Sequence, residues 1–393
     1  MMTPGAASGP PKAPLLRDPR FRSLVTQVAL CVLLAAVVWL LVEAARANLA
    51  RTNVASGFGF WNVTAGFDIS QTLIDYSSSS STYGQAFWVG LLNTLLVAAI
   101  GIVLATIVGF TIGIAQLSTN WLVARLAVGY VQLVRNVPLL LQLLFWYNAV
   151  LKALPDFRDS VRLPGGGYLN NRGLFLPGLD LGGAGPFVFC ALLAGIAVVA
   201  ALVMLARRGR IGALTATALS VLAVLGLPLA AFLVAGGTAS LVYPQMSRFN
   251  LYGGIEVLPE FVALVAGLVV YTGAFIAETV RAGLLAVPRG QTEAALALGL
   301  SRGVVLWRVV IPQAMRVITP PLTNQYLNLT KNSSLAVAIG YPDLVQIFTG
   351  TVLNQTGQAV EIVAITMAVY LAISLTTAVL MNVYNARVAL TER

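Results

Sequence analysis

The sequence contains no histidine, and its 393 residues include only two cysteines and three lysines. Without histidine the chain lacks the commonest general base and the commonest zinc ligand, so an H-E-x-x-H metal site is impossible. Cys31 and Cys190 both lie inside apolar runs, a placement that suggests neither a disulfide framework nor a metal site. No lysine is followed by serine or threonine, as a Walker A phosphate loop requires. The sequence therefore predicts no catalytic residue, no metal and no cofactor bound by this chain.

Charged residues are also scarce, at 10% of the chain against 58% hydrophobic residues. Several apolar runs reach the roughly 20 residues that a helix needs to cross about 30 Å of hydrocarbon. These runs predict an all-α, polytopic membrane protein with about eight transmembrane helices.

The apolar runs divide the chain into a cytoplasmic tail (1–23), a first span (24–42), a periplasmic loop (43–86), a transmembrane domain (87–385) and a cytoplasmic tail (386–393). The first run exceeds the 7 to 15 residues of a signal-peptide core, so it is expected to stay as an uncleaved span. Within the transmembrane domain, spans are predicted at 87–117, 137–154, 187–205, 211–234, 258–285, 314–339 and 362–383. The fourth and fifth spans form an inserted hairpin (187–234), and RLPGGGYLNNRG (162–173) is expected to be a solvated loop.

Charge predicts the orientation. With both termini in the cytoplasm, most of the 24 lysines and arginines fall on the cytoplasmic side, as the positive-inside rule requires. The net charge of +10 is thereby explained by topology, and no nucleic-acid partner is predicted.

A polar, glycine-broken stretch, QTEAALALGLSRGVVLWRVVIPQAM (291–315), lies between two predicted spans, in a cytoplasmic segment of residues 286–313. Glu293 is expected in the first turn of a short helix, where the helix dipole favours an acid, and Gly299 permits a left-handed turn that ends this helix. Ser301 can cap a second short helix, and Pro312 marks the return to the membrane. One face of the second helix is apolar: Leu300, Val304, Trp307 and Ile311. Such a face has no core to bury into, so it predicts a partner.

The same stretch contains Glu293-Ala294-Ala295, three residues, Gly299, nine residues and then Val309-Val310-Ile311-Pro312. This pattern resembles the EAA loop of ATP-binding-cassette (ABC) importer permeases, which in that family is the coupling helix that docks into a separate ATPase subunit. The resemblance implies that ATPase coupling rests on Glu293, Ala294, Ala295, Gly299, Ser301, Arg302, Trp307 and Pro312. From the residues alone, Glu293 could instead be no more than an acid that the helix dipole favours.

Four segments resemble consecutive signatures of the permeases for polar amino acids, the histidine/glutamine-type branch: GLLNTLL (90–96), RNVPLLLQLLFWY (135–147), FIAETVRAGLLAVPRGQTEAA (275–295) and IPQAMRVITPPLTNQYLNLTKNSSLAVAIGYPDLV (311–345). The usual core of this branch has five spans, which the extra first span and the inserted hairpin enlarge here in the manner of general L-amino acid permeases.

This resemblance implies a type I importer transmembrane domain in a bacterial inner membrane, working by alternating access. It also implies three kinds of partner: ATPase subunits that hold ATP and Mg, a periplasmic amino-acid-binding protein and a second permease. The inserted hairpin favours a sister subunit over a second copy of this chain.

The seventh predicted span carries a polar stripe on one helical face: Asn324, Gln325, Asn328, Lys331 and Asn332. Polar groups in hydrocarbon are costly unless they face protein or water, so the stripe is expected to line the substrate path. Hydrogen bonding between helices, or snorkelling for Lys331 near the outer face, is the alternative. Relatives that carry cationic amino acids tend to have acids at the positions of Gln325 and Asn332. The amides found here argue against a transporter dedicated to arginine, lysine or histidine.

Two smaller features have two interpretations each. Glu278 and Arg281 are either a gating pair or an intrahelical ion pair, and Gly109 and Gly113 provide close helix packing within the chain or with a partner. For the whole protein the alternative function is an ion-coupled secondary amino acid transporter. The sequence lacks the central intramembrane carboxylate and the two similar halves that such a transporter would show.

Overall fold

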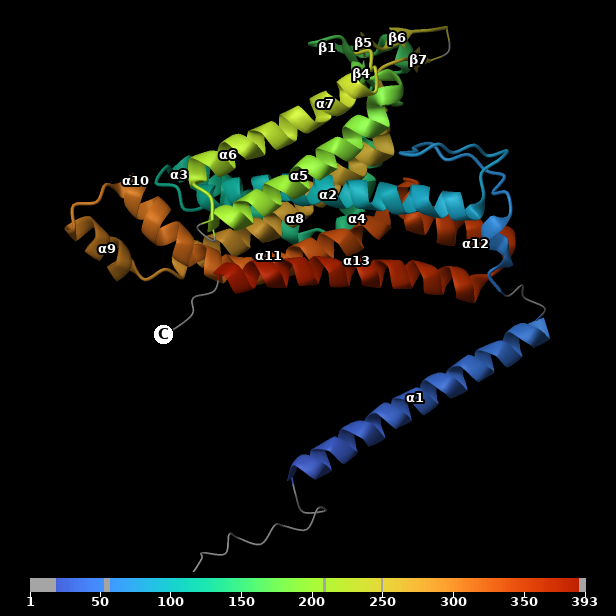
Figure 1. The fold of residues 1–393 in the computed structure, drawn as a ribbon, viewed down its shortest axis with the longest axis horizontal. Coiled ribbons are helices and arrows are strands. Elements are labelled where there is room, and N and C mark those ends of the chain that lie inside the picture. The colour runs from blue at the N-terminus through green and yellow to red at the C-terminus, as the bar shows by residue number, and fades with distance from the viewer. Residues whose placement is uncertain (1–18, 53–56, 208–209, 249, 389–393) are drawn as a thin grey trace, which may run out of the picture.

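The computed structural model describes residues 19–52, 57–207, 210–248 and 250–388. The predicted tails therefore lie largely outside the described residues. The chain is mostly helical, with a long bundle, a small β layer and a first helix, α1 (Pro19–Thr52), that runs apart from the bundle (Figure 1).

Five helices of the described chain are long and apolar enough to cross a membrane, and six if one bent pair counts as a single span. The five are α2 (Tyr83–Ala115), α5 (Gly185–Arg207), the run of α6, η6 and α7 (Ala213–Val221, Leu222–Gly226, Leu227–Val234), α8 (Pro259–Leu285) and α13 (Ala359–Val388). The bent pair joins α3 (Trp121–Asn136) to α4 (Leu139–Leu144) and its π-helical extension η3 (Phe145–Leu151) at 105°. The helical membrane fold is confirmed, while the predicted count of eight spans is reached only if α1 and α11 (Ile311–Asn332) also cross.

The remaining short elements connect these helices. They are η2 (Gly59–Asn62), η4 (Phe157–Asp159), η5 (Gly182–Ala184), α9 (Arg289–Ala297), α10 (Arg302–Val305), η7 (Leu306–Val310), η8 (Ser333–Ile339), η9 (Gln346–Val352) and α12 (Leu353–Thr356). The predicted seventh span, 314–339, is thus α11 followed by the 3₁₀ segment η8.

Helix α1 extends beyond the predicted span. Residues 43–52, expected in a loop, are helical. The reason is local: this stretch contains four alanines and two arginines, which are strong helix formers, and no glycine or proline.

Helices α2 and α8 form the centre of the bundle and approach closely at two glycines. A Cβ atom on Gly109 would lie 2.5 Å from the Cβ of Ile276, and one on Gly113 would lie 2.7 Å from the Cβ of Val280. Only glycine leaves room for this approach, so the GxxxG pair acts within the chain. Ile276 and Val280 belong to the main apolar core, together with residues of α4 and α11.

The segment before α2 folds onto the end of the bundle where α2 begins. Phe60 and Trp61 of η2 pack against the rings of Tyr83, Phe87 and Phe348. The Tyr76 hydroxyl donates to the Phe67 carbonyl at 2.8 Å, and burial raises the pKa of Tyr76 to about 12, which keeps it a neutral donor. The later part of the predicted loop therefore has a fixed structure.

The RLPGGGYLNNRG stretch forms antiparallel strands, so its prediction as a plain loop was wrong. β1 (Val161–Leu163) and β2 (Gly167–Asn170) pair across a turn in which Gly165 and Gly166 have φ of 89° and 86°. The four-stranded sheet continues through β3 (Gly173–Leu176) to β8 (Ile255–Val257). Two further pairs join β4 (Gly178–Asp180) to β5 (Ser240–Val242) and β6 (Gln245–Met246) to β7 (Leu251–Tyr252).

The inserted hairpin begins after β4 and ends before β5, so both of its ends lie at this β layer. α5 packs against α6 and α7, with Gly195 close to the carbonyl of Ala223. At the base of the hairpin, Asp180 of β4 pairs with Ser240 of β5. The β layer therefore holds the two ends of the hairpin together (Figure 1).

Candidate functional site

Two surfaces carry the residues singled out above, and the first is the segment from α9 to η7, here called the coupling segment. It projects at the end of the bundle away from α12 (Figure 1). α9 begins at Arg289, directly after Pro288, whose backbone is extended with ψ of 134° and which therefore stays outside the helix as its N-cap residue. Glu293 therefore lies in the second turn of α9, and the prediction that placed it in the first turn was wrong.

The end of α9 is fixed by backbone hydrogen bonds. Gly299 has φ of +76°, its amide donates to the Leu296 carbonyl at 2.9 Å, and the Leu300 amide donates to the Ala295 carbonyl at 3.4 Å. This pair of bonds is the Schellman motif, which needs a left-handed residue after the helix. Gly299 thus sets the angle at which the chain leaves α9.

The second short helix starts after Ser301, whose backbone is extended but whose side chain makes no capping hydrogen bond, contrary to its predicted role. α10, η7 and α11 then follow one another without a break, so Pro312 lies near the start of α11 inside a continuous run of helix, and its place at the return to the membrane stays a prediction. The π-helical turn η7 is the only change of helical type along this described run.

The coupling segment has a small core and a large uncovered surface. Ala295 and Val305 are buried where α9 folds back on α10. Leu298 and Trp307, by contrast, are 81% and 71% exposed. Glu293, Ala294, Arg302 and Pro312 are also exposed. The segment therefore presents apolar side chains with nothing in the described chain to cover them, which is typical of a docking surface.

The second surface, here called the path face, includes the polar stripe of α11. Asn324, Asn328 and Lys331 are exposed, and Gln325 and Asn332 are half-buried. The opposite side of α11 packs into the bundle through Ile318, Leu322 and Leu329, and Tyr326 shares a 2.9 Å hydrogen bond with Thr106 of α2. Pro320 and Pro321 remove two backbone donors without ending the helix. The structure thus brings the five predicted path residues onto one uncovered side of the subunit.

On α8, Tyr271, Phe275 and Glu278 follow at spacings of four and three, and all three side chains are half-buried. Glu278 and Arg281 form a bidentate ion pair, with nitrogen to oxygen distances of 2.5 and 3.1 Å. The intrahelical pairing expected from their spacing is therefore present, and their gating role stays a prediction.

Arg135 is a neighbour of Phe275 that sequence reasoning did not single out as a site residue. It lies in the last turn of α3, and its guanidinium lies 5.1 Å from the ring centroid of Phe275 in α8. One turn earlier, the Tyr130 hydroxyl donates to the Val270 carbonyl at 2.7 Å, which fixes α3 against the middle of α8. The signature that begins with Arg135 was visible in the sequence, but its contact with α8 was not.

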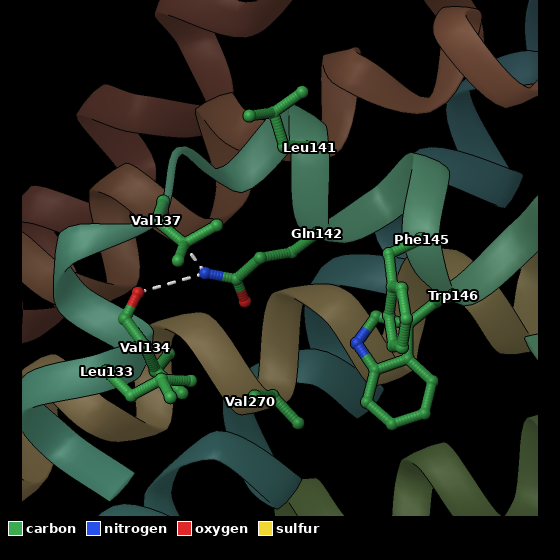
Figure 2. Close-up of a pocket in the computed structure, with 8 residues that line it drawn as sticks. All are labelled: Leu133, Val134, Val137, Leu141, Gln142, Phe145, Trp146 and Val270. Carbon is green, nitrogen blue, oxygen red and sulfur yellow. Dashed lines mark hydrogen bonds between the residues drawn. The ribbon is translucent and has the colours of Figure 1, made fainter. Parts of the chain in front are cut away.

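The bend between α3 and α4 has a specific chemical cause. Pro138 has no N–H to give to the Val134 carbonyl, and the Gln142 side chain supplies the missing donor at 2.9 Å, with a second bond to the Val137 carbonyl at 3.0 Å (Figure 2). Beside it is a cavity of about 310 Å³, lined by Leu133, Val134, Val137, Leu141, Gln142, Phe145, Trp146 and Val270.

A buried polar cluster, also missed, joins α2 to the turn before η9. Asn93 donates to the carbonyls of Gln71 and Pro342 at 2.9 and 2.8 Å, and Thr94 accepts from the Leu344 amide at 3.1 Å. The Asp343 carboxylate accepts from the Gln346 amide at 2.8 Å and from the Tyr370 hydroxyl at 3.1 Å. The segments GLLNTLL and GYPDLV, which resembled family signatures, contain three of these side chains.

Within the described residues, no group of three or more cysteine, aspartate or glutamate side chains is placed to hold a metal ion.

Comparison with known proteins gives close matches. Residues 101–390 match the family described as binding-protein-dependent transport system inner membrane component. The general L-amino acid transport system permease protein AapQ of Rhizobium johnstonii is 50% identical over 383 residues, covering 96% of this chain and 94% of that protein. The putative amino-acid ABC transporter permease protein YhdX of Escherichia coli is 48% identical, covering 96% of both chains.

A third relative is the glutamate/glutamine/aspartate/asparagine transport system permease protein BztB of Rhodobacter capsulatus. It is 43% identical over 427 residues, covering 98% of this chain and 99% of that protein. Among solved structures, an amino acid ABC transporter crystallised with histidines matches 78% of this chain and 95% of its own, with 22% identity and a TM-score of 0.47.

Proposed function

The chain belongs to the family of binding-protein-dependent transport system inner membrane components and is the permease subunit of an amino acid ABC importer, and from this we propose which residues couple it to ATP hydrolysis and which line its substrate path. Membership of this family sets aside the alternative of an ion-coupled secondary transporter. The subunit is not catalytic, and ATP and Mg bind to the partner ATPase.

The coupling segment docks into the ATPase. The observation that carries this proposal is its uncovered apolar surface, on which Leu298 at the end of α9 and Trp307 in η7 are the most exposed. The exposed Glu293, Ala294, Ser301 and Arg302, with Pro312 at the start of α11, complete the docking set. Ala295 is buried and supports the segment from within, and Gly299 fixes where α9 ends. Because α10, η7 and α11 form one continuous run, a displacement of the docked segment passes directly to the polar stripe of α11.

The subunit crosses the membrane eight times, with α1 and α11 added to the six candidate spans, and both termini are cytoplasmic. The polar stripe makes α11 too polar to be recognised as a span by hydropathy alone. Its buried side nevertheless packs in the main core beside α8. A helix packed in this way crosses with α8, and its polar side faces water or a partner subunit.

The substrate path runs along the path face, past Asn324, Gln325, Asn328, Lys331 and Asn332, with Glu278 and Arg281 as a gate toward the cytoplasm. Asn324, Asn328 and Lys331 are exposed in the single subunit, so in the membrane a second permease covers them and encloses the path. Alternating access then moves the two permeases against each other. The inserted hairpin favours a sister permease as the second subunit.

The substrates are polar L-amino acids, delivered by a periplasmic amino-acid-binding protein. The relatives' names support this range, because one is named for general L-amino acids and another for glutamate, glutamine, aspartate and asparagine. Neutral amides at Gln325 and Asn332 agree with neutral or acidic substrates rather than with cationic ones alone.

The proposal is tested by purifying the detergent-solubilised permease complex and measuring ATP-driven uptake of glutamate, glutamine and leucine after reconstitution. The test variant combines Glu293→Lys with Gly299→Asp, which places a side chain at a left-handed backbone position and reverses a charge. We expect it to lose ATPase co-purification and uptake. Gly290→Ala, in the same helix, is the control, because nothing lies within 4 Å of the added methyl. Equal uptake and ATPase recovery in the wild type and the double variant would show that docking occurs elsewhere.

A further inference from the structure

A second cavity lies at the root of the coupling segment, at the end of the bundle where α10 lies (Figure 1). Its volume of about 500 Å³ is within the roughly 300–1,000 Å³ of ligand pockets. Four elements that are separate in sequence line it: α2 with Ala115, α3 with Val123, α8 with Leu284, and η7 with Leu306 and Val310. The coupling segment therefore leaves a space between η7 and the end of α2.

The lining of this cavity suits an apolar ligand. Its two polar side chains are both engaged within the chain. The Thr111 hydroxyl donates to the Ile107 carbonyl at 2.8 Å, and the Ser118 hydroxyl oxygen accepts from the Asn120 amide at 3.2 Å. The other lining side chains are apolar. Water makes few hydrogen bonds in such a space, whereas an apolar molecule fills it without loss.

An apolar stripe on α2 leads into the cavity. Val103, Ile107 and Ile114 follow at spacings of four and seven, so they lie on one face of the helix. They are 58%, 58% and 56% exposed, and Ile114 also lines the cavity. The helix packs on α8 through a different face, the one that carries Gly109. Stripe and cavity therefore form one continuous apolar surface that the described chain leaves uncovered.

The depth of this surface matches that of one lipid leaflet. Trp88 near the start of α2 and Trp121 at the start of α3 are 54% and 70% exposed, and indole rings are enriched at the two membrane interfaces. From Trp88 to Ala115 the helix rises by about 40 Å, close to the thickness of a bilayer with its interfacial regions, about 40–45 Å. The stripe thus lies at the depth of the cytoplasmic acyl chains, and the cavity lies where those chains meet their headgroups.

We propose that the cavity binds a phospholipid of the cytoplasmic leaflet, whose acyl chain lies along the stripe and whose upper carbons contact Leu306 and Val310. The headgroup stays outside the cavity, since the lining has no free polar group for it. The bound lipid supports η7, the turn that joins the coupling segment to α11. This inference goes beyond the transport function and rests on the placement of α2 across the membrane.

Lipid binding and ATPase docking use different sides of η7. Leu306 and Val310 are four residues apart and both line the cavity. Trp307, which is 71% exposed and belongs to the docking set, does not line it. Adjacent residues of a helix do not share a face, so the lipid and the ATPase can be bound at the same time.

The test uses the purified permease–ATPase complex in vesicles of phosphatidylethanolamine and phosphatidylglycerol. The vesicles contain a trace of phosphatidylcholine with a photoreactive diazirine, placed either near the ester end of the acyl chain or at its methyl end. Illumination attaches the lipid to the residues that it touches, and peptide mass spectrometry locates them. We expect the ester-end probe to label residues 306–310 and the methyl-end probe to label residues 103–107.

Two variants fill the cavity from different walls, Ala115→Phe and Val123→Trp. Each is expected to lower labelling of residues 306–310, relative to that of α13, by about tenfold, because the added ring occupies the space of the acyl chain. Ala197→Phe is the matched control, at an exposed alanine of α5 outside the cavity, and should be labelled as the wild type is. Co-purification of the ATPase shows that a variant is folded, and either filling variant alone decides the test.

Hydrogen exchange provides a measurement without a photoreactive probe. In the detergent-solubilised complex, added dioleoylphosphatidylglycerol is expected to slow amide exchange in residues 302–310 by about threefold or more, because the bound chain restrains η7. Ala115→Phe should show no such response, since its ring already fills the space.

Three results would overturn the lipid site. Equal labelling of residues 306–310 in the wild type and both filling variants would place the lipid elsewhere. Labelling that appears only after removal of the ATPase would identify the ATPase as the occupant. An equal response of exchange to lipid in the wild type and Ala115→Phe would exclude the cavity as its origin. None of these measurements needs transport, so a wild type without ATP-driven uptake contradicts the proposed function and not the lipid site.

Discussion

Asn93 shows how a single buried amide can join distant parts of this subunit. Its nitrogen donates to the carbonyl of Gln71, in the segment that covers the end of the bundle where α2 begins, and to that of Pro342, in the turn before η9. Next to it, Thr94 accepts from the Leu344 amide. Backbone carbonyls without partners are costly in a buried site, so these bonds fix both segments to α2.

We expect Asn93→Ala to destabilise the subunit by about 1–3 kcal/mol, because it leaves two buried carbonyls without a donor. The measurement is the thermal unfolding temperature of the purified complex in detergent. Asn354→Ala is the control, since Asn354 is exposed and bonds only to Gly350, one turn before it. Unfolding temperatures that fall equally in the two variants would contradict the role given to Asn93.

Contacts between near neighbours were predictable from the sequence, and contacts between distant segments were not. The Glu278–Arg281 pair follows from a spacing of three, and the left-handed turn at Gly299 from the residue type. The Tyr130–Val270 bond and the Arg135–Phe275 contact each join residues 140 positions apart. Periodicity carries no information on such pairs, so Arg135 and Gln142 were missed as site residues.

The pairing of α2 with α8 is the main packing interaction between elements. We expect Gly109→Ala to weaken it by about 1–3 kcal/mol, because the added methyl would meet the side chain of Ile276 and force the helices apart. Gly129→Ala in α3 is the matched control, with no atom within 4 Å of the new methyl. Since alanine favours helix over glycine, the control should be neutral or slightly stabilising. Thermal unfolding in detergent checks both variants. A Gly109→Ala variant as stable as the control would show that α2 and α8 accommodate the methyl group without loss of stability.

The helices α2, α5, α6 to α7 and α8 were located from hydropathy to within a few residues, because about 20 apolar residues in sequence are a strong signal. The β layer was missed for the opposite reason. Its strands are two to four residues long and include glycines, so RLPGGGYLNNRG looks like a loop until β3 and β8, which are far apart in sequence, pair beside it. The start of α9 was placed late because Pro288 and Gly290 were taken to interrupt the helix, whereas α9 begins between them.

On the scale of the whole subunit, the inserted hairpin is separable from the core. Because Asp180 and Ser240 are paired neighbours, residues 181–239 can be replaced by an Asn-Gly turn that joins β4 directly to β5. We expect the shortened subunit to fold and to retain its ATPase, since the coupling segment lies outside the replaced residues. Co-purification of the ATPase and size-exclusion chromatography measure this outcome. A shortened chain that aggregates would show that the hairpin is part of the folding core.

The two cysteines have a practical value for observing the transport cycle. Cys31 and Cys190 are both exposed and lie on α1 and α5, outside the packing of α2, α8 and α11. Replacing both by serine disturbs no core contact and yields a thiol-free background. Single thiols can then be introduced in pairs on the coupling segment and the path face, and spin-label distances between them can be followed as nucleotide binds and is hydrolysed.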